Sequence, residues 1–262
     1  MKKTLLYTML FAVAMFTLTS CGDDDSAGKS RITYYAELTL NDDAYMTVPV
    51  GSTFADPGCV ATMGGEDVSD QVVASGSVNT AKLGFYTLNY VVTNPDGFSA
   101  STSRTVAVVD PNNFASTYYG ESQYGSRHYF NAPISITDNG DGTYTINDVL
   151  GGFYSYGRYP GYDAYGYDFF ADAVLSLNDD NTINIESVGS WYFGVYPITI
   201  AEGDGTYNPE TGEIEMNLDF DGDPFYVKLT KLKRVHSYEE NNIFRSTSPG
   251  RPDIQFVRKG GY

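Results

Sequence analysis

The sequence predicts an all-β protein, in which a β-sandwich is followed by an antiparallel meander that closes as a barrel or as a second sandwich. Three observations predict this fold class. Aromatic residues make up 15% of the 262 residues, and aromatic side chains favour strands. The 27 glycines outnumber the 16 lysines and arginines, and many lie in turn motifs between short alternating runs. Only 19% of the residues are charged, which is low for a helical cytosolic enzyme.

Residues 1–20 are typical of a secretory leader. Two lysines precede an apolar stretch over residues 5–18, which is shorter than a usual bilayer-spanning helix. The run Leu-Thr-Ser-Cys that ends at Cys21 resembles the lipobox of bacterial lipoproteins. In that family the cysteine is acylated and becomes the new N-terminus, so the resemblance implies a lipid anchor in the outer membrane through Cys21. The alternative is an ordinary secretory leader with an incidental cysteine.

Residues 21–31 form an acidic, polar tether. The run Gly-Asp-Asp-Asp over residues 22–25 resembles the surface-export signal of Bacteroidota-type lipoproteins, which implies the outer face of the outer membrane. The alternative is a solvated leash without a signal. If Cys21 is acylated, Cys59 is the one remaining thiol, so no intrachain disulfide can form. We expect Cys59 to be a small buried apolar residue.

Residues 32–110 show the period of two that strands require. In the run from Tyr86 to Val92 the apolar side chains alternate, so that Tyr86 and Leu88 point to the same side of the sheet. Asn-Pro-Asp-Gly over residues 94–97 predicts the turn that follows, and the next strand is expected over residues 102–109. Short strands joined by such turns predict a β-sandwich.

Three motifs in this segment resemble a bacterial immunoglobulin-like domain. They are Val-Pro-Val-Gly-Ser-Thr-Phe at 48–54 with Asp-Pro-Gly at 56–58, Gly-Phe-Tyr-Thr-Leu-Asn-Tyr at 84–90, and Thr-Val-Ala-Val-Val-Asp at 105–110. The resemblance implies an immunoglobulin-like β-sandwich that serves as a spacer or adhesion module of a surface protein. It implies no catalytic residue.

Residues 110–113, Asp-Pro-Asn-Asn, mark a boundary that we expect to be short and fairly stiff. Residues 114–232 then alternate strand candidates with turn motifs at 138–142, 178–181 and 208–212, which predicts an antiparallel β-domain. The expected strands are 128–137, 143–149, 168–177, 182–187, 191–200, 213–220 and 225–231. Gly212 suits the left-handed position that closes a hairpin.

This second segment also carries a resemblance. Residues 144–154 (Tyr-Thr-Ile-Asn-Asp-Val-Leu-Gly-Gly-Phe-Tyr) and 205–212 (Gly-Thr-Tyr-Asn-Pro-Glu-Thr-Gly) are similar to an uncharacterised C-terminal β-domain. That domain occurs in surface lipoproteins of Bacteroidota polysaccharide-utilisation loci, commonly behind an immunoglobulin-like domain. The resemblance implies a context of glycan acquisition. It stops near residue 232, and we interpret the basic stretch 233–262 as a disordered tail or as an arm that folds back onto the acidic body.

The segment 151–170 is the strongest candidate for a ligand surface. It holds six tyrosines and five glycines. A tyrosine ring offers a flat apolar face on which the C–H groups of a sugar can stack, and polar side chains can bind the sugar hydroxyls. A second aromatic run begins with the single tryptophan, which we expect to open a strand at the rim of the domain. The candidate ligand-binding residues are Tyr154, Tyr156, Arg158, Tyr159, Tyr162, Trp191 and Tyr192. The alternative is that these rings belong to a core, because tyrosine is a strong strand former.

Several function classes lack support. The net charge of −17 argues against a nucleic-acid partner, since phosphate binding needs lysine and arginine. The sequence has no Gly-x-Ser-x-Gly elbow, no His-Glu-x-x-His motif and no phosphate loop. The run Asp-Phe-Asp-Gly-Asp at 219–223 lacks the spacing of a calcium loop. We expect no catalytic residue, no metal and no cofactor.

The sequence therefore predicts a non-catalytic lipoprotein of the cell surface that binds a polysaccharide or oligosaccharide through an aromatic surface of its C-terminal domain. Captured glycan would pass to protein partners of an uptake system. The alternative is a structural, adhesion or scaffold lipoprotein whose tyrosines contact a protein partner. An enzyme such as a glycosidase would require a cleft with paired carboxylates.

Overall fold

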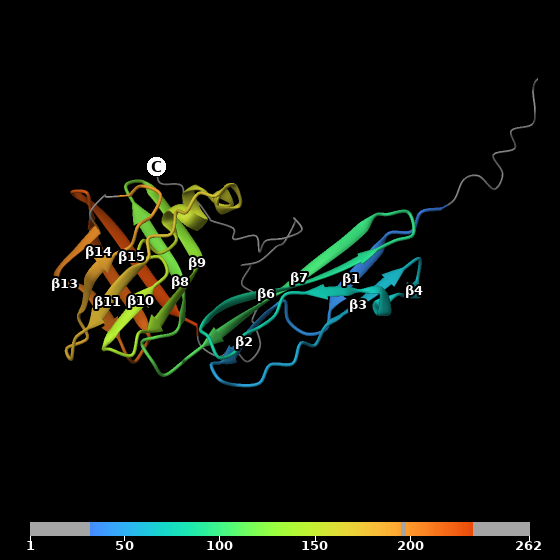
Figure 1. Cartoon of the computed structure of the whole chain (residues 1–262), viewed down its shortest axis with the longest axis horizontal. Helices are drawn as coiled ribbons and strands as arrows, with labels where there is room; N and C mark the ends of the chain where they lie inside the picture. The colour runs from blue at the N-terminus through green and yellow to red at the C-terminus, as the bar shows by residue number, and fades with distance from the viewer. Residues whose placement is uncertain (1–31, 195–197, 233–262) are drawn as a thin grey trace, which may run out of the picture.

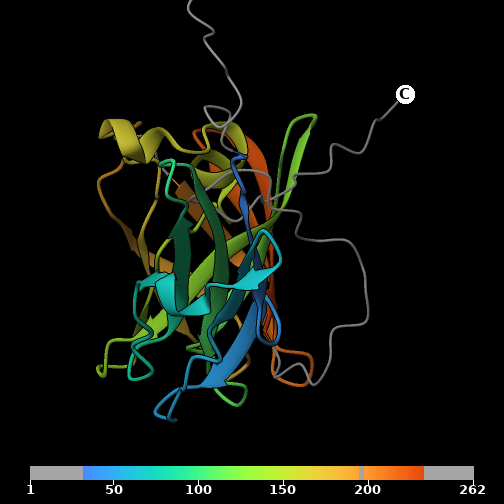
Figure 2. The same ribbon diagram turned by 90° about the vertical axis from the view of Figure 1, so that its right-hand side faces the viewer.

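The computed structural model describes residues 32–194 and 198–232. The predicted leader at 1–20, the tether at 21–31 with Cys21, and the basic tail at 233–262 lie outside the described residues. The regular elements of the described residues are fifteen strands and three short helical turns, which confirms the all-β class. Its strands form two units that lie one after the other along the long axis of the molecule (Figure 1). Figure 2 looks along that axis, with the N-terminal unit in front.

The N-terminal unit is a sandwich of a three-stranded and a four-stranded sheet. The first sheet has the order β1 (Ala36–Leu40), β3 (Cys59–Met63), β4 (Glu66–Asp67). The second has the order β2 (Tyr45–Pro49), β7 (Ser99–Val109), β6 (Gly84–Thr93), β5 (Val73–Ser75). A short 3-10 turn, η1 (Ser69–Gln71), precedes β5. Buried apolar side chains fill the space between the sheets, among them Val48, Leu88, Tyr90, Val106 and Val108. The half-buried Cys59 packs against this cluster.

The two longest strands of the sandwich, β6 and β7, form a hairpin, and its turn lies at the predicted Asn-Pro-Asp-Gly motif. Asn94 accepts hydrogen bonds from the N–H groups of Asp96 at 3.0 Å and Phe98 at 2.8 Å through its side-chain oxygen. Gly97 has a φ of 87°, which a residue with a Cβ rarely adopts. The side-chain hydrogen bonds and this glycine set the register of ten residue pairs, from Gly84 opposite Val108 to Thr93 opposite Ser99.

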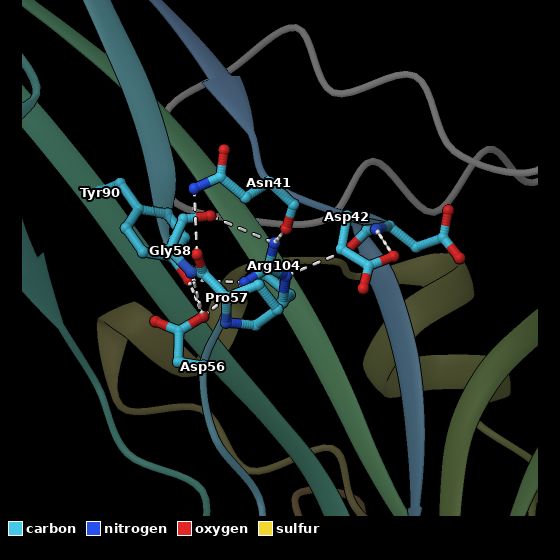
Figure 3. A network of polar contacts seen from close by, with 8 residues as sticks. Asn41, Asp42, Asp56, Pro57, Gly58, Tyr90 and Arg104 are labelled. Atoms are coloured by element: carbon cyan, nitrogen blue, oxygen red, sulfur yellow. Dashed lines mark hydrogen bonds and ion pairs between the residues drawn. The ribbon is translucent and has the colours of Figure 1, made fainter.

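Arg104, on β7, is fully buried inside the sandwich, and Figure 3 shows the polar groups around its guanidinium. One nitrogen pairs with the carboxylate of Asp56, and Nε donates to the carbonyl of Asp43 at 3.0 Å. The Tyr90 hydroxyl donates to the same Asp56 oxygen at 2.6 Å. Burial pushes the pKa of Asp56 upward, but hydrogen bonds from Tyr90 and Gly58 and the charge of Arg104 bring it below its ordinary value. The Asp-Pro-Gly motif therefore supplies the counter-charge of a buried arginine.

The two units meet through a small apolar joint. Val109 at the end of β7 and Leu232 after the last strand are buried together with Ala107. The ring of Tyr119 packs on this cluster, with its centroid 6.1 Å from that of Tyr45 and 5.9 Å from that of Phe85. Because Tyr119 belongs to the second unit and both other rings belong to the first, side-chain packing couples the orientation of the two units.

The C-terminal unit is an eight-stranded antiparallel sheet that curls into a nearly closed barrel. Its order is β12 (Ile183–Val188), β11 (Ala173–Leu177), β10 (Thr143–Ile146), β9 (Arg127–Asp138), β8 (Thr117–Tyr124), β15 (Asp223–Lys231), β14 (Glu213–Phe220), β13 (Ile198–Asn208). The two ends of the sheet meet at a β-bridge between Thr182, just before β12, and Thr206 on β13, and the Tyr207 N–H donates to the Asn181 carbonyl at 2.9 Å. Gly205 permits this approach, since a Cβ there would lie 2.9 Å from the carbonyl oxygen of Ile183. The seam is thus closed at one end of the strands.

The predicted strand bounds agree best with the observed ones where turn motifs define the ends of the strands. The strand at 213–220 is observed with these bounds, and Gly212 has the predicted left-handed φ of 75°. The expectation of a strand at 191–200 was wrong in its first half, because residues 191–194 form a turn in which the Gly194 N–H donates to the Trp191 carbonyl at 2.8 Å. The expected strand at 168–177 begins only at Ala173. The strand β8 was missed.

Candidate functional site

The tyrosine-rich segment is attached to the core by a buried carboxylate. Asp148 is fully buried, and it accepts hydrogen bonds from the Ser155 hydroxyl at 2.7 Å and from the Leu150 N–H at 3.1 Å. Burial raises the pKa of Asp148 to about 7, although these hydrogen bonds act in the opposite direction. Gly152 turns the chain with a φ of 79°, and a Cβ there would lie 2.2 Å from the Cβ of Ala132. The base of the segment therefore has no room for a larger residue.

Beyond this base the segment is helical. A π-helical turn, η2 (Phe153–Arg158), is followed by a 3-10 turn, η3 (Tyr162–Tyr165). Figure 1 shows both, in yellow, at one end of the C-terminal sheet. Each turn begins after a glycine in the left-handed conformation, Gly152 and Gly161. An extended chain would have placed Tyr154 and Tyr156 on one face, but both residues lie within the π-helical turn η2.

Exposed tyrosines gather on this segment and on the loop after β12. Tyr159 is half-buried and stacks on the buried Phe169, with ring centroids 4.6 Å apart. We call the following residues, with their exposed fractions, the tyrosine patch: Tyr159 (half-buried), Tyr162 (45%), Tyr165 (79%), Tyr167 (42%) and Tyr192 (52%). The Tyr192 N–H donates to the Asp168 carbonyl at 2.7 Å, which joins the two loops that carry the patch.

The structure divides the predicted ligand residues into two groups. Tyr159, Tyr162 and Tyr192 belong to the tyrosine patch, and Arg158 is exposed beside it, with Cζ 5.5 Å from the centroid of the Tyr159 ring. Tyr154 and Tyr156 are half-buried and pack against the core. The centroid of Tyr154 lies 5.0 Å from that of Phe193, and burial raises the pKa of its hydroxyl to about 12.

Trp191 lies inside the core and not at a rim. Only 5% of its surface is exposed, and its ring packs edge-on against Phe193 at 5.1 Å and beside Tyr154 at 5.6 Å. Its Nε1 is buried and has no hydrogen-bond partner among the described residues. The turn at residues 191–194 directs the indole inward, so Trp191 offers no face to a ligand at the surface.

Sequence reasoning did not select Tyr165 and Tyr167, although Tyr165 is the most exposed residue of the tyrosine patch. The spacing of the glycines in the sequence could have indicated that these tyrosines are exposed. Gly161 and Gly166, with φ values of 88° and 84°, bracket a stretch too short for a buried strand. Such a stretch directs its large side chains to solvent, because little of its backbone can be paired inside a sheet.

The charged groups beside the tyrosine patch are mostly acidic. Asp163 lies within η3, Asp168 lies between Tyr167 and Phe169, and Asp172 follows shortly after; all three are exposed. Asp168 accepts a hydrogen bond from the Phe170 N–H at 3.0 Å, which stabilises the turn. The site thus combines aromatic faces, phenolic hydroxyls and carboxylates, a set that can bind polar ligands without forming or breaking bonds.

The structure gives no metal centre in its described part: within residues 32–194 and 198–232, no three His, Cys, Asp or Glu side chains are grouped so that they could hold an ion. The Asp219 carboxylate, in the motif that superficially suggests a calcium loop, accepts a hydrogen bond from the Gly222 N–H at 2.7 Å and so closes a hairpin turn. In the same described ranges, no helix has the length and apolar character needed to cross a membrane.

Two family models match different parts of the chain. Residues 38–108 match the family model of the bacterial surface protein Ig-like domain, and residues 109–231 match that of a C-terminal domain. The crystal structure of the lipoprotein BT2262 from Bacteroides thetaiotaomicron is 26% identical, with a TM-score of 0.52, over 76% of this chain and 100% of that one. No match was found among curated proteins.

A second solved structure, CBM51-2 in complex with GlcNAc and INT domains from Clostridium perfringens ZmpB, is 16% identical over 70% of this chain and 29% of that one. Its TM-score of 0.25 is too low to support any argument. The two family models and the Bacteroides structure confirm the resemblance drawn from the sequence motifs. The chain therefore carries a bacterial surface protein Ig-like domain over residues 38–108 and this C-terminal domain over residues 109–231, and it is similar to the lipoprotein BT2262.

Proposed function

We propose that this protein captures glycan at the cell surface, without catalysis, through the tyrosine patch of its C-terminal domain. In this proposal Cys21 is acylated and anchors the chain in the outer membrane, and the Ig-like domain acts as a spacer. Captured glycan then passes to protein partners of an uptake system.

The observation that carries the proposal is the exposure of four tyrosines on ordered turns. Tyr165 exposes 79% of its surface and Tyr192 exposes 52%, yet both rings lie beside other aromatic rings. Large aromatic side chains are normally buried, so a group of exposed ones points to a binding surface. The C–H groups of a sugar can stack on the ring faces, while hydroxyls and carboxylates at the ring edges bind sugar hydroxyls.

We expect modest affinity, with a dissociation constant of roughly micromolar to millimolar, because an exposed site buries little ligand surface. The hydrogen bond between Asp148 and Ser155 favours binding, because a segment that is already ordered loses less conformational entropy when a ligand binds. No bond is made or broken, so the acidic residues serve as hydrogen-bond acceptors.

The test is an affinity-gel and glycan-array screen of the chain from residue 21 onward with Cys21→Ser, which removes the acylation site. The patch variant carries Tyr165→Ala and Tyr192→Ala, and the matched control carries Tyr35→Ala, an exposed tyrosine of the Ig-like domain. We expect the patch variant to lose binding at least tenfold with unchanged circular dichroism, while the control binds normally.

The alternative function is a scaffold or adhesion protein whose tyrosine patch contacts a protein. If the folded, monomeric chain binds no glycan across a broad panel of plant, host and microbial polysaccharides, the proposal of glycan capture fails. The same patch variant then becomes the probe for a protein partner.

A further inference from the structure

The chain segment that carries most of the tyrosine patch has more acidic than basic residues. From Phe153 to Asp172 the sequence carries three aspartates and one basic residue, Arg158. The three aspartates are exposed, and two of them are sequence neighbours of patch residues: Asp163 follows Tyr162 inside η3, and Asp168 follows Tyr167. Aspartates carry negative charge at neutral pH, and the whole chain adds to this field with a net charge of −17. A polyanion that approaches the patch is therefore repelled.

The rings of the patch are not coplanar. The planes of Tyr162 and Tyr165 meet at 66°, those of Tyr162 and Tyr167 at 50°, and those of Tyr167 and Tyr192 at 79°. A crystalline polysaccharide presents a flat face, which coplanar rings can contact together. Rings inclined at these angles cannot lie on one plane at the same time. They suit a single chain whose sugar units can rotate about their glycosidic bonds and meet one ring at a time.

From these two observations we infer that the ligand of the tyrosine patch is a soluble, single glycan chain without acidic sugars or sulfate groups. The inference rests on the proposed function and narrows it to one class of substrate. The carboxylates have two roles in it: they accept hydrogen bonds from neutral sugar hydroxyls, and they exclude uronate-rich and sulfated polysaccharides by like-charge repulsion.

The test compares a soluble neutral polysaccharide, its oxidised form and two crystalline polysaccharides, with the chain carrying Cys21→Ser. A soluble neutral polysaccharide that binds in the screen is oxidised at its primary hydroxyls to carboxylates, which gives a charged probe with the same backbone. Microcrystalline cellulose and chitin serve as flat insoluble probes in a pull-down. We expect the oxidised form to bind at least fivefold more weakly at 20 mM NaCl and to recover part of that loss at 300 mM, because salt screens exposed charges.

The variant that tests the role of the carboxylates carries Asp163→Asn and Asp168→Asn. Asparagine keeps the side-chain oxygen that accepts from the Phe170 N–H. The matched control carries Asp179→Asn and Glu210→Gln, which make the same change of charge in exposed turns at the opposite ends of β11 and β13. We expect the first variant to raise the ratio of its affinity for the oxidised probe to its affinity for the neutral one by roughly three- to tenfold, while the control leaves this ratio unchanged.

The outcomes separate the inference from the proposed function. Equal or tighter binding of the oxidised probe, or strong binding to the crystalline particles, overturns the inference and leaves glycan capture intact. A gain by the control equal to that of the patch variant also overturns it, since general charge would then explain the discrimination. If no probe binds in any form, the proposed function fails and the inference fails with it.

Discussion

The hydroxyl of Ser155 donates a hydrogen bond of 2.7 Å to the buried carboxylate of Asp148 and so connects the first helical turn of the tyrosine-rich segment to the core. The tyrosine patch begins only four residues after Ser155. The order of the exposed tyrosine patch therefore depends on a polar contact that solvent does not reach.

Replacement of Asp148 by asparagine is expected to change how stability depends on pH. Burial raises the pKa of Asp148 to about 7 in the folded state, against about 3.8 as an ordinary aspartate. The folded chain then binds the extra proton, so the contribution of Asp148 is fully present below about pH 4 and is lost as the pH rises through 7. The asparagine side chain keeps an acceptor for the Leu150 N–H and does not titrate.

The measurement is urea unfolding between pH 4 and pH 8. Relative to Asp148→Asn, the wild-type chain should lose stability as the pH rises. Asp180→Asn is the contrasting control: hydrogen bonds from Thr182 lower the pKa of Asp180, so its contribution is present above pH 4 and is lost only in acid. Parallel curves for the wild type and Asp148→Asn would contradict the prediction.

Removal of the counter-charge of Arg104 should destabilise the Ig-like domain. Asp56→Ala leaves a fully buried guanidinium without its carboxylate and removes an acceptor of the Tyr90 hydroxyl. We expect a loss of about 3 kcal/mol in the free energy of unfolding, because breaking a buried pair leaves an uncompensated charge. Calorimetry of this variant beside Asp70→Ala, an exposed aspartate in η1, measures the difference. Equal melting temperatures for the two variants would show that the network adds little.

Lys231 is a buried lysine at the end of β15, and its replacement should lower the free energy of unfolding of the C-terminal domain. Its Nζ donates to the Tyr207 hydroxyl at 2.9 Å and to the carbonyl of Asn113. Lys231→Met keeps the length of the side chain but leaves both acceptors without this donor, so we expect a loss of about 1–3 kcal/mol. Lys228→Met is the matched control, since its partly exposed pairs with Glu213 and Glu215 should contribute under about 1 kcal/mol. Chemical denaturation would contradict the prediction if Lys228→Met proved the more harmful change.

Trp191→Ala is expected to act on stability and not on ligand contact. The indole is 5% exposed, and its removal would leave a cavity beside Phe193 and Tyr154, at about 3–5 kcal/mol. Tyr192→Ala, at the exposed neighbouring position, should stay within about 0.5 kcal/mol. The single tryptophan also provides the check, because acrylamide should quench its fluorescence poorly in the folded chain. Efficient quenching would mean that the indole is open to solvent.

The strands could be predicted where local signals agree with one another. Alternation from Tyr86 to Val92 and the turn motif at Asn94 both act over a few residues, and the hairpin of β6 and β7 follows them. The strand β8 (Thr117–Tyr124) was missed because it contains Gly120. A Cβ at that position would lie 2.7 Å from the carbonyl oxygen of Gly151. The glycine is therefore required by close packing against a distant segment and not by the strand in which it lies.

The sequence by itself determined the all-β class, the turns and the region that carries the tyrosine patch, because alternation and turn chemistry are local properties of the chain. Tertiary structure decided which rings are exposed. Trp191 and Tyr192 are neighbours of similar chemistry, yet one is buried in the core and the other is half exposed. Burial depends on what distant strands bring to each side of the chain, and no local pattern carries that information.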